Sequence, residues 1–377
     1  MKTVQPTTSN ELREALREAA SVDRRIVLGG GFTKDAMGGA VADAGTRIST
    51  AGLKRVLAYE PKDLTVSVEA GLPYAELTAM LDGEKQMIPL DPPLGEVSTV
   101  GGVAAANLSG SRRRLYGTAR DLVIGMSYCT VEGDVAETGA LVVKSVAGYD
   151  IHKLLIGSFG TLAAIASVNF KVSPAPEVTR TFVFSHGAAG QAMETRGRIA
   201  GSVLQPAAVD YLNPEAAFRA GLKGHLILVR AAGTERLLAR YAAELAGADV
   251  YEGAREAAVW EAIGAMAPRW VGEDGGLAVV KLAHGAKAIA EIEASADGPV
   301  WSQALSGVTR VGCRDAGAVR KAFGLGHAGV VEWSDASRRE GFELWPEPGA
   351  DFELMKQLKA VFDPKGLLNP GRLNGRI

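Results

Sequence analysis

The chain has 377 residues, 47% of them hydrophobic and 22% charged, which is ordinary for a soluble globular protein. Its 41 basic and 43 acidic side chains leave a formal net charge of −2, so the composition argues against nucleic acid as a partner. No run approaches the ~20 apolar residues of a membrane-spanning helix, and the N-terminus lacks the apolar region of a signal peptide. We therefore expect a cytoplasmic protein, peripheral to the inner membrane only through partners.

The first half of the chain alternates short apolar strands with glycine-rich turns. Thr8 and Glu11 form a capping-box pattern ahead of apolar residues at helical spacing. Pro73 is expected to begin a second helix. Strands are predicted over 26–28, 64–70, 122–130, 135–143 and 165–172.

The composition and the residue pattern of the chain change after Pro174 and Pro176. Alanine-rich helical stretches, such as 235–245 and 252–267, then alternate with short strands, and the final segment combines a helix with a turn-rich tail. The best strand candidates in this half are 226–229, 278–282 and 330–333. We therefore predict a first domain over 1–175, a second, α+β domain over 176–350, and a C-terminal segment over 351–377.

The two cysteines, Cys129 and Cys313, lie far apart in the sequence. We expect reduced core thiols rather than a disulfide. The chain contains no Cys-x-x-Cys, so it is predicted to hold no iron–sulfur cluster and no metal site of its own.

A triple glycine, Gly29-Gly30-Gly31, directly follows the first predicted apolar strand. Successive backbone amides at glycines can converge on an anion, because no side chain keeps the ligand away. The segment fails the G-x-G-x-x-G pattern, since Lys34 stands at the last position, and the chain contains no Gly-Lys dipeptide for a Walker loop. Taken alone, it indicates a structural turn as readily as a phosphate cradle.

A second glycine segment strengthens the cradle interpretation. Ser98–Asn107 offers hydroxyls, two glycines and a small-residue stretch that is expected to form a short helix, whose first amides suit an anion. A third small-residue cluster lies at Gly157–Thr161. Between them, Arg112-Arg113-Arg114 is compatible with contact to phosphates, contact to an acidic partner or a solvated loop.

Four stretches together resemble the vanillyl-alcohol-oxidase/PCMH flavoprotein superfamily, and within it the glycolate oxidase subunits. They are Gly29–Asp35, Ser98–Asp121, Lys144–Thr161 and Phe362–Arg372. The resemblance is dense over 1–175, thin over the second domain and good again at the tail. It implies an α+β fold with a two-part PCMH-type FAD-binding domain, an α+β cap domain and a C-terminal tail that returns to the flavin.

The resemblance also implies which residues bind FAD. Those expected to line the pyrophosphate are Gly29, Gly30, Gly31, Phe32 and Thr33. Those expected on the second side of the cofactor are Pro92, Ser98, Thr99, Gly101, Gly102, Gly110 and Gly117. Gly160, Thr161 and Ile165 would contact the adenine or the ring through backbone, and Asn369 would approach the isoalloxazine from the tail. No catalytic residue is assigned.

The sequence departs from the family at two places. Members with covalent flavin carry a histidine beside the first loop, whereas Gly29–Asp35 has none, so FAD is expected to be non-covalent. The 2-hydroxy-acid dehydrogenases carry a paired-histidine segment for metal and substrate, but here no two of the five histidines stand at ligand spacing. This absence counts against independent oxidation of 2-hydroxy acids.

Three functions follow from these expectations. The first is an FAD-binding subunit of a glycolate-oxidase-like complex, which oxidises glycolate or D-lactate and passes electrons to an iron–sulfur subunit, with a GlcD-like flavin subunit as the other partner. The second is a flavin-holding electron-transfer or assembly subunit with no substrate turnover of its own. The third is a stand-alone FAD oxidase that acts on another alcohol.

Overall fold

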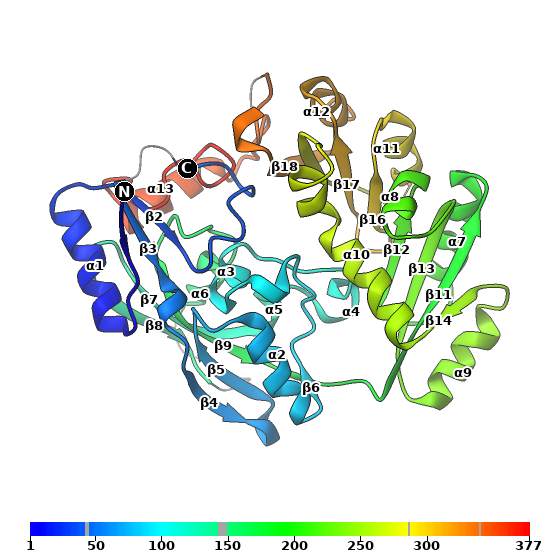
Figure 1. Ribbon diagram of the computed structural model, residues 1–377, viewed down its shortest axis with the longest axis horizontal. Coiled ribbons are helices and arrows are strands. Elements are labelled where there is room, and N and C mark those ends of the chain that lie inside the picture. The colour runs from blue at the N-terminus through cyan, green and yellow to red at the C-terminus, as the bar shows by residue number, and fades with distance from the viewer. Residues whose placement is uncertain (42–44, 142–148, 286, 339–340) are drawn as a thin grey trace. The chain divides into compact units, whose positions relative to one another are not determined.

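The computed structural model describes residues 1–41, 45–141, 149–285, 287–338 and 341–377 (Figure 1). These residues form two compact units. The first contains 1–109, 117–175 and 347–377, and the second contains 110–116 and 176–346. The predicted first domain, 1–175, therefore differs from the first unit at 110–116, which belongs to the second. The predicted boundary at 350 lies close to the observed return at 347.

The first unit contains a small parallel sheet and a larger antiparallel one. The small sheet has the order β1-β3-β2, with β1 at Lys2–Val4, β3 at Thr46–Ser49 and β2 at Ile26–Gly29. The larger sheet has the order β4-β5-β9-β7-β8, over Val56–Glu60, Thr65–Glu69, Ala164–Lys171, Val123–Cys129 and Val135–Gly139. A short pair joins β6 (Gln86–Met87) to β10 (Ser173–Pro174).

The helices of the first unit are mostly short. They are α1 (Ser9–Ser21), α2 (Tyr74–Gly83), α3 (Val100–Ala105), α5 (Ala119–Leu122), α6 (His152–Leu155) and α13 (Phe352–Phe362), with 3-10 turns at Thr50–Gly52, Pro61–Asp63 and Gly95–Val97. Thr8 caps α1 by accepting from the Glu11 amide at 3.2 Å, as predicted, whereas the Glu11 carboxylate accepts from the amide of Thr7 at 2.8 Å. The apolar face of α1 is buried against residues of both sheets, which follows from its helical spacing.

The C-terminal tail completes the small parallel sheet. In the order β1-β3-β2, strand β2 has one edge without a strand partner. The Ile26 amide donates to the Leu367 carbonyl at 2.8 Å, and the Asn369 amide donates to the Ile26 carbonyl at 3.0 Å. The buried Asp363 and Lys359 fix this return, since the Lys359 ammonium donates to the Asp363 carboxylate at 2.6 Å and to the Thr161 carbonyl at 2.7 Å.

The second unit is built on one antiparallel sheet of eight strands, in the order β14-β11-β13-β12-β16-β17-β15-β18. Their bounds are β11 Val178–His186, β12 Ala208–Leu212, β13 His225–Gly233, β14 Asp249–Tyr251, β15 Ala278–Ala283, β16 Val300–Gln303, β17 Val308–Cys313 and β18 Ala328–Ser334. The helices are α4 Arg113–Tyr116, α7 Ala189–Ala200, α8 Pro214–Arg219, α9 Glu235–Glu244, α10 Gly253–Gly272, α11 Ile289–Ser295 and α12 Ala316–Phe323, with a 3-10 turn at Ala336–Arg338.

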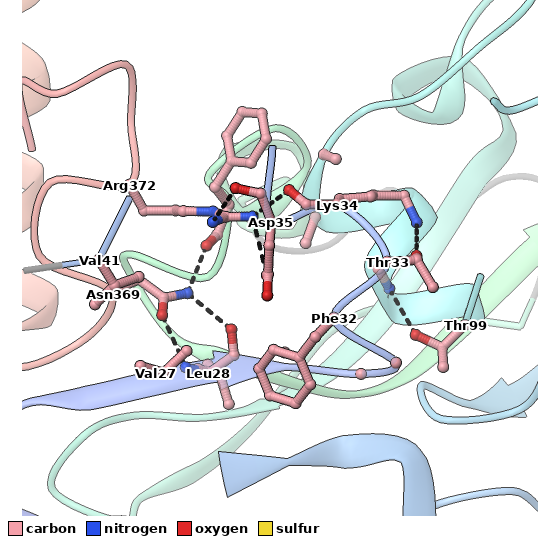
Figure 2. Close-up of a pocket in the computed structure, with 17 residues that line it drawn as sticks. Val27, Leu28, Phe32, Thr33, Lys34, Asp35, Val41, Thr99, Asn369 and Arg372 are labelled. Carbon is pink, nitrogen blue, oxygen red and sulfur yellow. Dashed lines mark hydrogen bonds and ion pairs between the residues drawn. The ribbon is translucent and has the colours of Figure 1, made fainter. Parts of the chain in front are cut away.

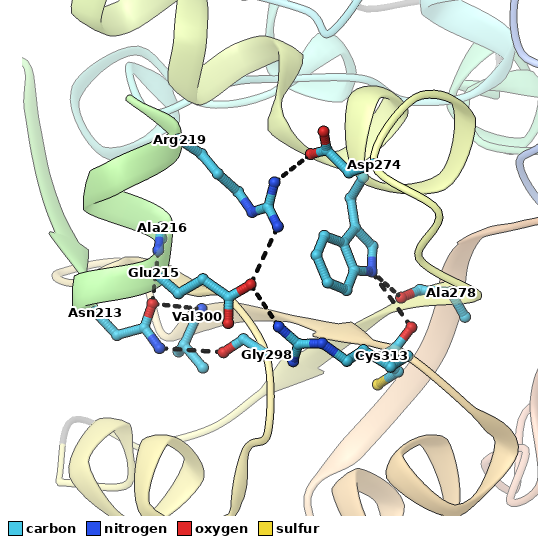
Figure 3. A network of polar contacts seen from close by, with 11 residues as sticks. Asn213, Glu215, Ala216, Arg219, Asp274, Ala278, Gly298, Val300 and Cys313 are labelled. Carbon is cyan, nitrogen blue, oxygen red and sulfur yellow. Dashed lines mark hydrogen bonds and ion pairs between the residues drawn. The ribbon is translucent and has the colours of Figure 1, made fainter. Parts of the chain in front are cut away.

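Polar contacts fix α8 and α10 of this unit to its strands (Figure 3). Asn213 caps α8 and also binds the next strand, since its Oδ1 accepts from the amides of Ala216 and Val300, each at 2.9 Å. The Trp270 indole, at the end of α10, donates to the Ala278 carbonyl at 3.1 Å. All five tryptophans of the chain lie in this unit: Trp260, Trp270, Trp301, Trp333 and Trp345.

The segment 110–116 leaves the first unit and is bound within the second. The Ser111 hydroxyl donates to the buried Asp210 carboxylate, and the Arg114 guanidinium donates to the Pro206 carbonyl at 3.1 Å and the Gln205 side chain at 3.2 Å. At least Arg114 of the predicted basic run is therefore neither a solvated side chain nor a residue of the pocket described below.

The two cysteines are free and buried, as expected. Within the described residues, no helix is both long and apolar enough to cross a membrane.

Candidate cofactor site

A pocket of about 540 Å³, partly open to solvent, lies in the first unit where three distant segments and Phe159 meet (Figure 2). The first segment is the end of β2 and the loop after it, the second is the start and end of α3, and the third is the C-terminal tail. The lining residues are Val27, Leu28, Gly29, Gly30, Gly31, Phe32, Thr33, Lys34, Asp35, Val41, Thr99, Gly102, Ala105, Ala106, Phe159, Asn369 and Arg372.

The three glycines of the first loop serve different purposes. A Cβ on Gly29 would lie 2.7 Å from the Phe32 ring, and a Cβ on Gly30 would lie 2.1 Å from Thr99 Oγ1. These two positions are glycine because neighbouring side chains approach the backbone. At Gly31 the nearest atom is the Val97 carbonyl oxygen at 3.4 Å, which is ordinary contact. The protein itself therefore leaves room for a Cβ only at Gly31, in a loop that lines the pocket.

The second segment approaches the first through Thr99. Its hydroxyl accepts from the Gly102 amide at 3.2 Å and so caps α3. Ser98, the preceding residue, is 1% exposed and does not line the pocket. Its hydroxyl donates to the Leu94 carbonyl and accepts from the Lys34 ammonium, each at 2.6 Å.

Lys34 is the charged side chain that the first loop turns inward. It is 8% exposed, and its ammonium donates to Ser98 Oγ and, at 3.2 Å, to Thr33 Oγ1. Of the described residues, no carboxylate forms an ion pair with it. Burial, together with the nearby positive charge of Arg372, lowers the pKa of Lys34 to about 8.

The tail closes the third side of the pocket with two polar side chains. Arg372 donates to the carbonyls of Lys34 and, at 3.1 Å, Gly39, and so holds the end of the first loop. Asn369 Oδ1 accepts from the Leu28 amide at 2.7 Å, while its Nδ2 donates to the carbonyls of Leu28 at 2.9 Å and Phe159 at 2.8 Å. Arg372 therefore acts on the backbone of the first segment, and Asn369 acts on the backbone of Leu28 and Phe159.

Three non-glycine residues that line this pocket have left-handed backbone. Phe32, Phe159 and Asn369 all line it, with φ values of 55°, 53° and 43°. This conformation is unfavourable for a bulky residue such as phenylalanine, and it persists where the surrounding structure requires it. The Phe32 ring lies between the Gly29 backbone and the Arg47 guanidinium, which stands 3.6 Å from the ring centroid.

The structure brings together eight of the residues predicted to bind the cofactor: Gly29, Gly30, Gly31, Phe32, Thr33, Thr99, Gly102 and Asn369. The other eight do not line this pocket: Pro92, Ser98, Gly101, Gly110, Gly117, Gly160, Thr161 and Ile165.

Several of these eight have a packing reason for their identity. Gly101 lies against Ala70, where a Cβ would come within 2.7 Å, and Gly117 lies against Asp121 at 2.6 Å. Thr161 is buried and donates to the Ser158 carbonyl at 2.7 Å. Gly110 belongs to the second unit.

The sequence prediction missed the charged lining residues. Lys34, Asp35 and Arg372 each ended or followed a stretch that resembled the family, and a cation beside a glycine-rich loop was the signal that could have identified Lys34. Val27, Leu28, Val41, Ala105, Ala106 and Phe159 also line the pocket without prediction. Lys144, in the third stretch, lies outside the described residues, whereas Tyr149 is described and is 88% exposed.

Comparison with known proteins assigns this geometry to a family. The family profile of the FAD binding domain matches residues 2–139, and that of the C-terminal domain of FAD linked oxidases matches residues 346–373. The chain carries two segments that match domains of FAD-linked oxidases. Its cofactor is FAD. All residues that line the pocket lie in the two matched segments, except Phe159.

Two curated relatives illustrate the similarity. Glycolate oxidase subunit GlcE of Escherichia coli is 33% identical over 172 residues, which is 45% of this chain and 49% of that subunit, so this match spans about half the relative's length. Glycolate oxidase subunit GlcD of Bacillus subtilis is 25% identical over 98% of this chain and 88% of that subunit.

A solved structure of alkyldihydroxyacetonephosphate synthase has the same fold. It superposes with a TM-score of 0.73 at 16% identity, over 98% of this chain and 75% of that one. The predicted PCMH-type FAD-binding fold is thereby confirmed.

The residues of the pocket fit a dinucleotide flavin. Gly31 leaves open the position that a Cβ would fill, and Lys34 supplies a buried positive charge for a phosphate. None of the residues that line the described pocket is histidine, cysteine or tyrosine, the side chains to which flavins can be attached covalently.

Proposed function

We propose that this oxidase is the FAD-binding subunit of a glycolate-oxidase-like complex and that it oxidises a small 2-hydroxy acid such as glycolate or D-lactate. The observation that carries the proposal is the single pocket formed where the two family-matched segments meet. Similarity to subunits GlcE and GlcD supports the choice of substrate class.

The first loop, Thr99 and the tail would hold FAD without a covalent bond. The Gly29–Gly31 backbone would face the diphosphate, and Lys34 would neutralise part of its charge. Arg372 and Asn369 would keep that loop in position through its carbonyls and those of the strand before it. We further propose that the second unit is the cap domain that shapes the substrate site.

Oxidation of a 2-hydroxy acid to a 2-oxo acid removes two electrons and two protons, one hydrogen from C2 and one from the hydroxyl. When bound, FAD supplies the two-electron acceptor for this reaction. The electrons must then leave the subunit. We propose an iron–sulfur subunit as their acceptor and a GlcD-like flavin subunit as the second partner, in a complex on the cytoplasmic side of the inner membrane.

Anaerobic titration of the purified yellow protein tests this function. We expect full release of FAD on acid denaturation, as for a non-covalent flavin, and bleaching of the visible flavin band by glycolate or D-lactate. L-Lactate is the matched control, since it differs from D-lactate only in configuration at C2. A protein that takes up no FAD on reconstitution would contradict the proposal.

The same titration distinguishes this function from the second candidate, a flavin-holding electron-transfer or assembly subunit. Its support is the similarity to a protein named as a subunit, GlcE. In that case hydroxy acids leave the flavin oxidised, while dithionite reduces it and the reduced protein passes electrons to a partner. Rapid oxygen consumption during turnover of another alcohol would instead indicate a stand-alone oxidase.

A further inference from the structure

Lys34 has one ammonium hydrogen that the described residues do not use. A lysine ammonium carries three N–H donors. Two of them are directed at Ser98 Oγ and Thr33 Oγ1, at 2.6 and 3.2 Å. Lys34 lines the pocket, and a Cβ built on Gly102, another lining residue, would stand 3.7 Å from its Nζ. The third donor is therefore available to a ligand between the first loop and α3.

The charges around Lys34 call for an anion. Arg372 is the charged group whose field reaches it, and that field is repulsive. Asp35, the acidic residue of the same pocket, is 60% exposed in its side chain and is directed at Arg47 and Arg372, each at 3.7 Å. Arg47 itself covers the Phe32 ring. A buried cation held beside other cations is unfavourable until a ligand brings negative charge.

We propose that Lys34 is the counter-charge of the FAD diphosphate and that its protonation is coupled to cofactor binding. This inference rests on the proposed function, because it takes FAD as the occupant of the pocket. It is more specific than the proposed function, because it names the diphosphate as the group that Lys34 recognises.

The coupling has a definite direction. Because the pKa of Lys34 is about 8 in the protein without cofactor, the side chain is charged at pH 7 and largely neutral at pH 9. The negative charge of the diphosphate raises this pKa in the complex, so binding above pH 8 takes up a proton. Affinity is therefore constant below pH 8 and falls above it, by about tenfold between pH 7 and pH 9.

The test measures FAD binding to apoprotein at pH 7 and pH 9, with quenching of flavin fluorescence as the readout. Wild-type protein should show the tenfold loss. Lys34→Arg keeps the charge at both pH values and should bind FAD with no such loss. Lys34→Met should bind about 10- to 100-fold more weakly at pH 7, with little further change at pH 9. Lys365→Met, which removes an exposed charge from the same unit, should behave as wild type.

Two further measurements test which group of the ligand Lys34 recognises and how Lys34 affects the stability of the apoprotein. Riboflavin, which has no phosphate, should bind wild-type and Lys34→Met apoprotein alike, while FMN should show a smaller difference than FAD. The Lys34→Met apoprotein should also melt at a higher temperature than wild type at pH 7, because a buried charge without a carboxylate partner has been removed.

These results distinguish two kinds of failure. Wild-type apoprotein that binds no FAD at either pH overturns the proposed function. Wild-type protein that binds FAD equally at both pH values, or a Lys34→Met variant that binds FAD as tightly as wild type, overturns only the role of Lys34.

Discussion

Replacing Asn369 by alanine is expected to lower the free energy of unfolding of the apoprotein by about 2–4 kcal/mol, because three hydrogen bonds to backbone groups are lost. Asn369 is 2% exposed, so water does not replace the partners of Leu28 and Phe159. The side-chain amide continues the pairing that the tail backbone begins at Ile26. The measurement is urea unfolding of the apoprotein, followed by circular dichroism.

Two other substitutions at this position separate the causes. Asn369→Gly also loses the amide but relieves the left-handed backbone at φ 43°, so it should be less harmful than alanine by about 1 kcal/mol. Asn369→Asp keeps the acceptor for the Leu28 amide but turns an oxygen toward two carbonyls, and it should be at least as harmful as alanine.

The hydrogen bonds of Asn369 give it a structural role beside the contact to the isoalloxazine that family resemblance implies. If its purpose were to touch the isoalloxazine, the alanine variant would change the flavin spectrum and leave the apoprotein as stable as wild type. That outcome would contradict the structural explanation. We expect the opposite order, with loss of stability first and loss of FAD as its consequence, because the Gly29–Gly31 loop directly follows Leu28.

Alanine at Gly30 and at Gly31 is expected to have opposite effects. At Gly30 a Cβ would come within 2.1 Å of Thr99 Oγ1, displace that side chain and break the cap of α3, at a cost of about 1–3 kcal/mol in stability. At Gly31 the added Cβ meets protein atoms only at 3.4 Å, so stability should change by less than about 0.5 kcal/mol.

For FAD affinity we expect the larger direct effect at Gly31, the position where alanine changes stability least. Gly31→Ala fills the position through which a phosphate approaches the backbone, and we expect FAD affinity to fall at least about tenfold with the fold intact. Apoprotein unfolding and FAD content, measured on both variants, provide the check. A Gly31→Ala protein that retains FAD as wild type would show that the diphosphate lies elsewhere.

Much of the first unit could be predicted from local pattern. The capping residue Thr8, the short strand before the triple glycine and the strand around Val66 all have signals within a few residues of one another. The second unit was harder, because strands such as β16 and β17 are short and their sequences, VWSQ and VTRVGC, do not alternate regularly between apolar and polar residues.

The sequence by itself predicted a short strand that leads into the triple glycine, and family resemblance connected this loop with the other glycine-rich segments. Only the tertiary structure decided why each glycine is there. Gly29 and Gly30 are required by the approach of Phe32 and Thr99, and Gly31 alone leaves space for a ligand. The reason is physical: close approach between segments depends on their positions in space, and neither the charge state of Lys34 nor the partners of Asn369 can be computed before distant parts of the chain have met.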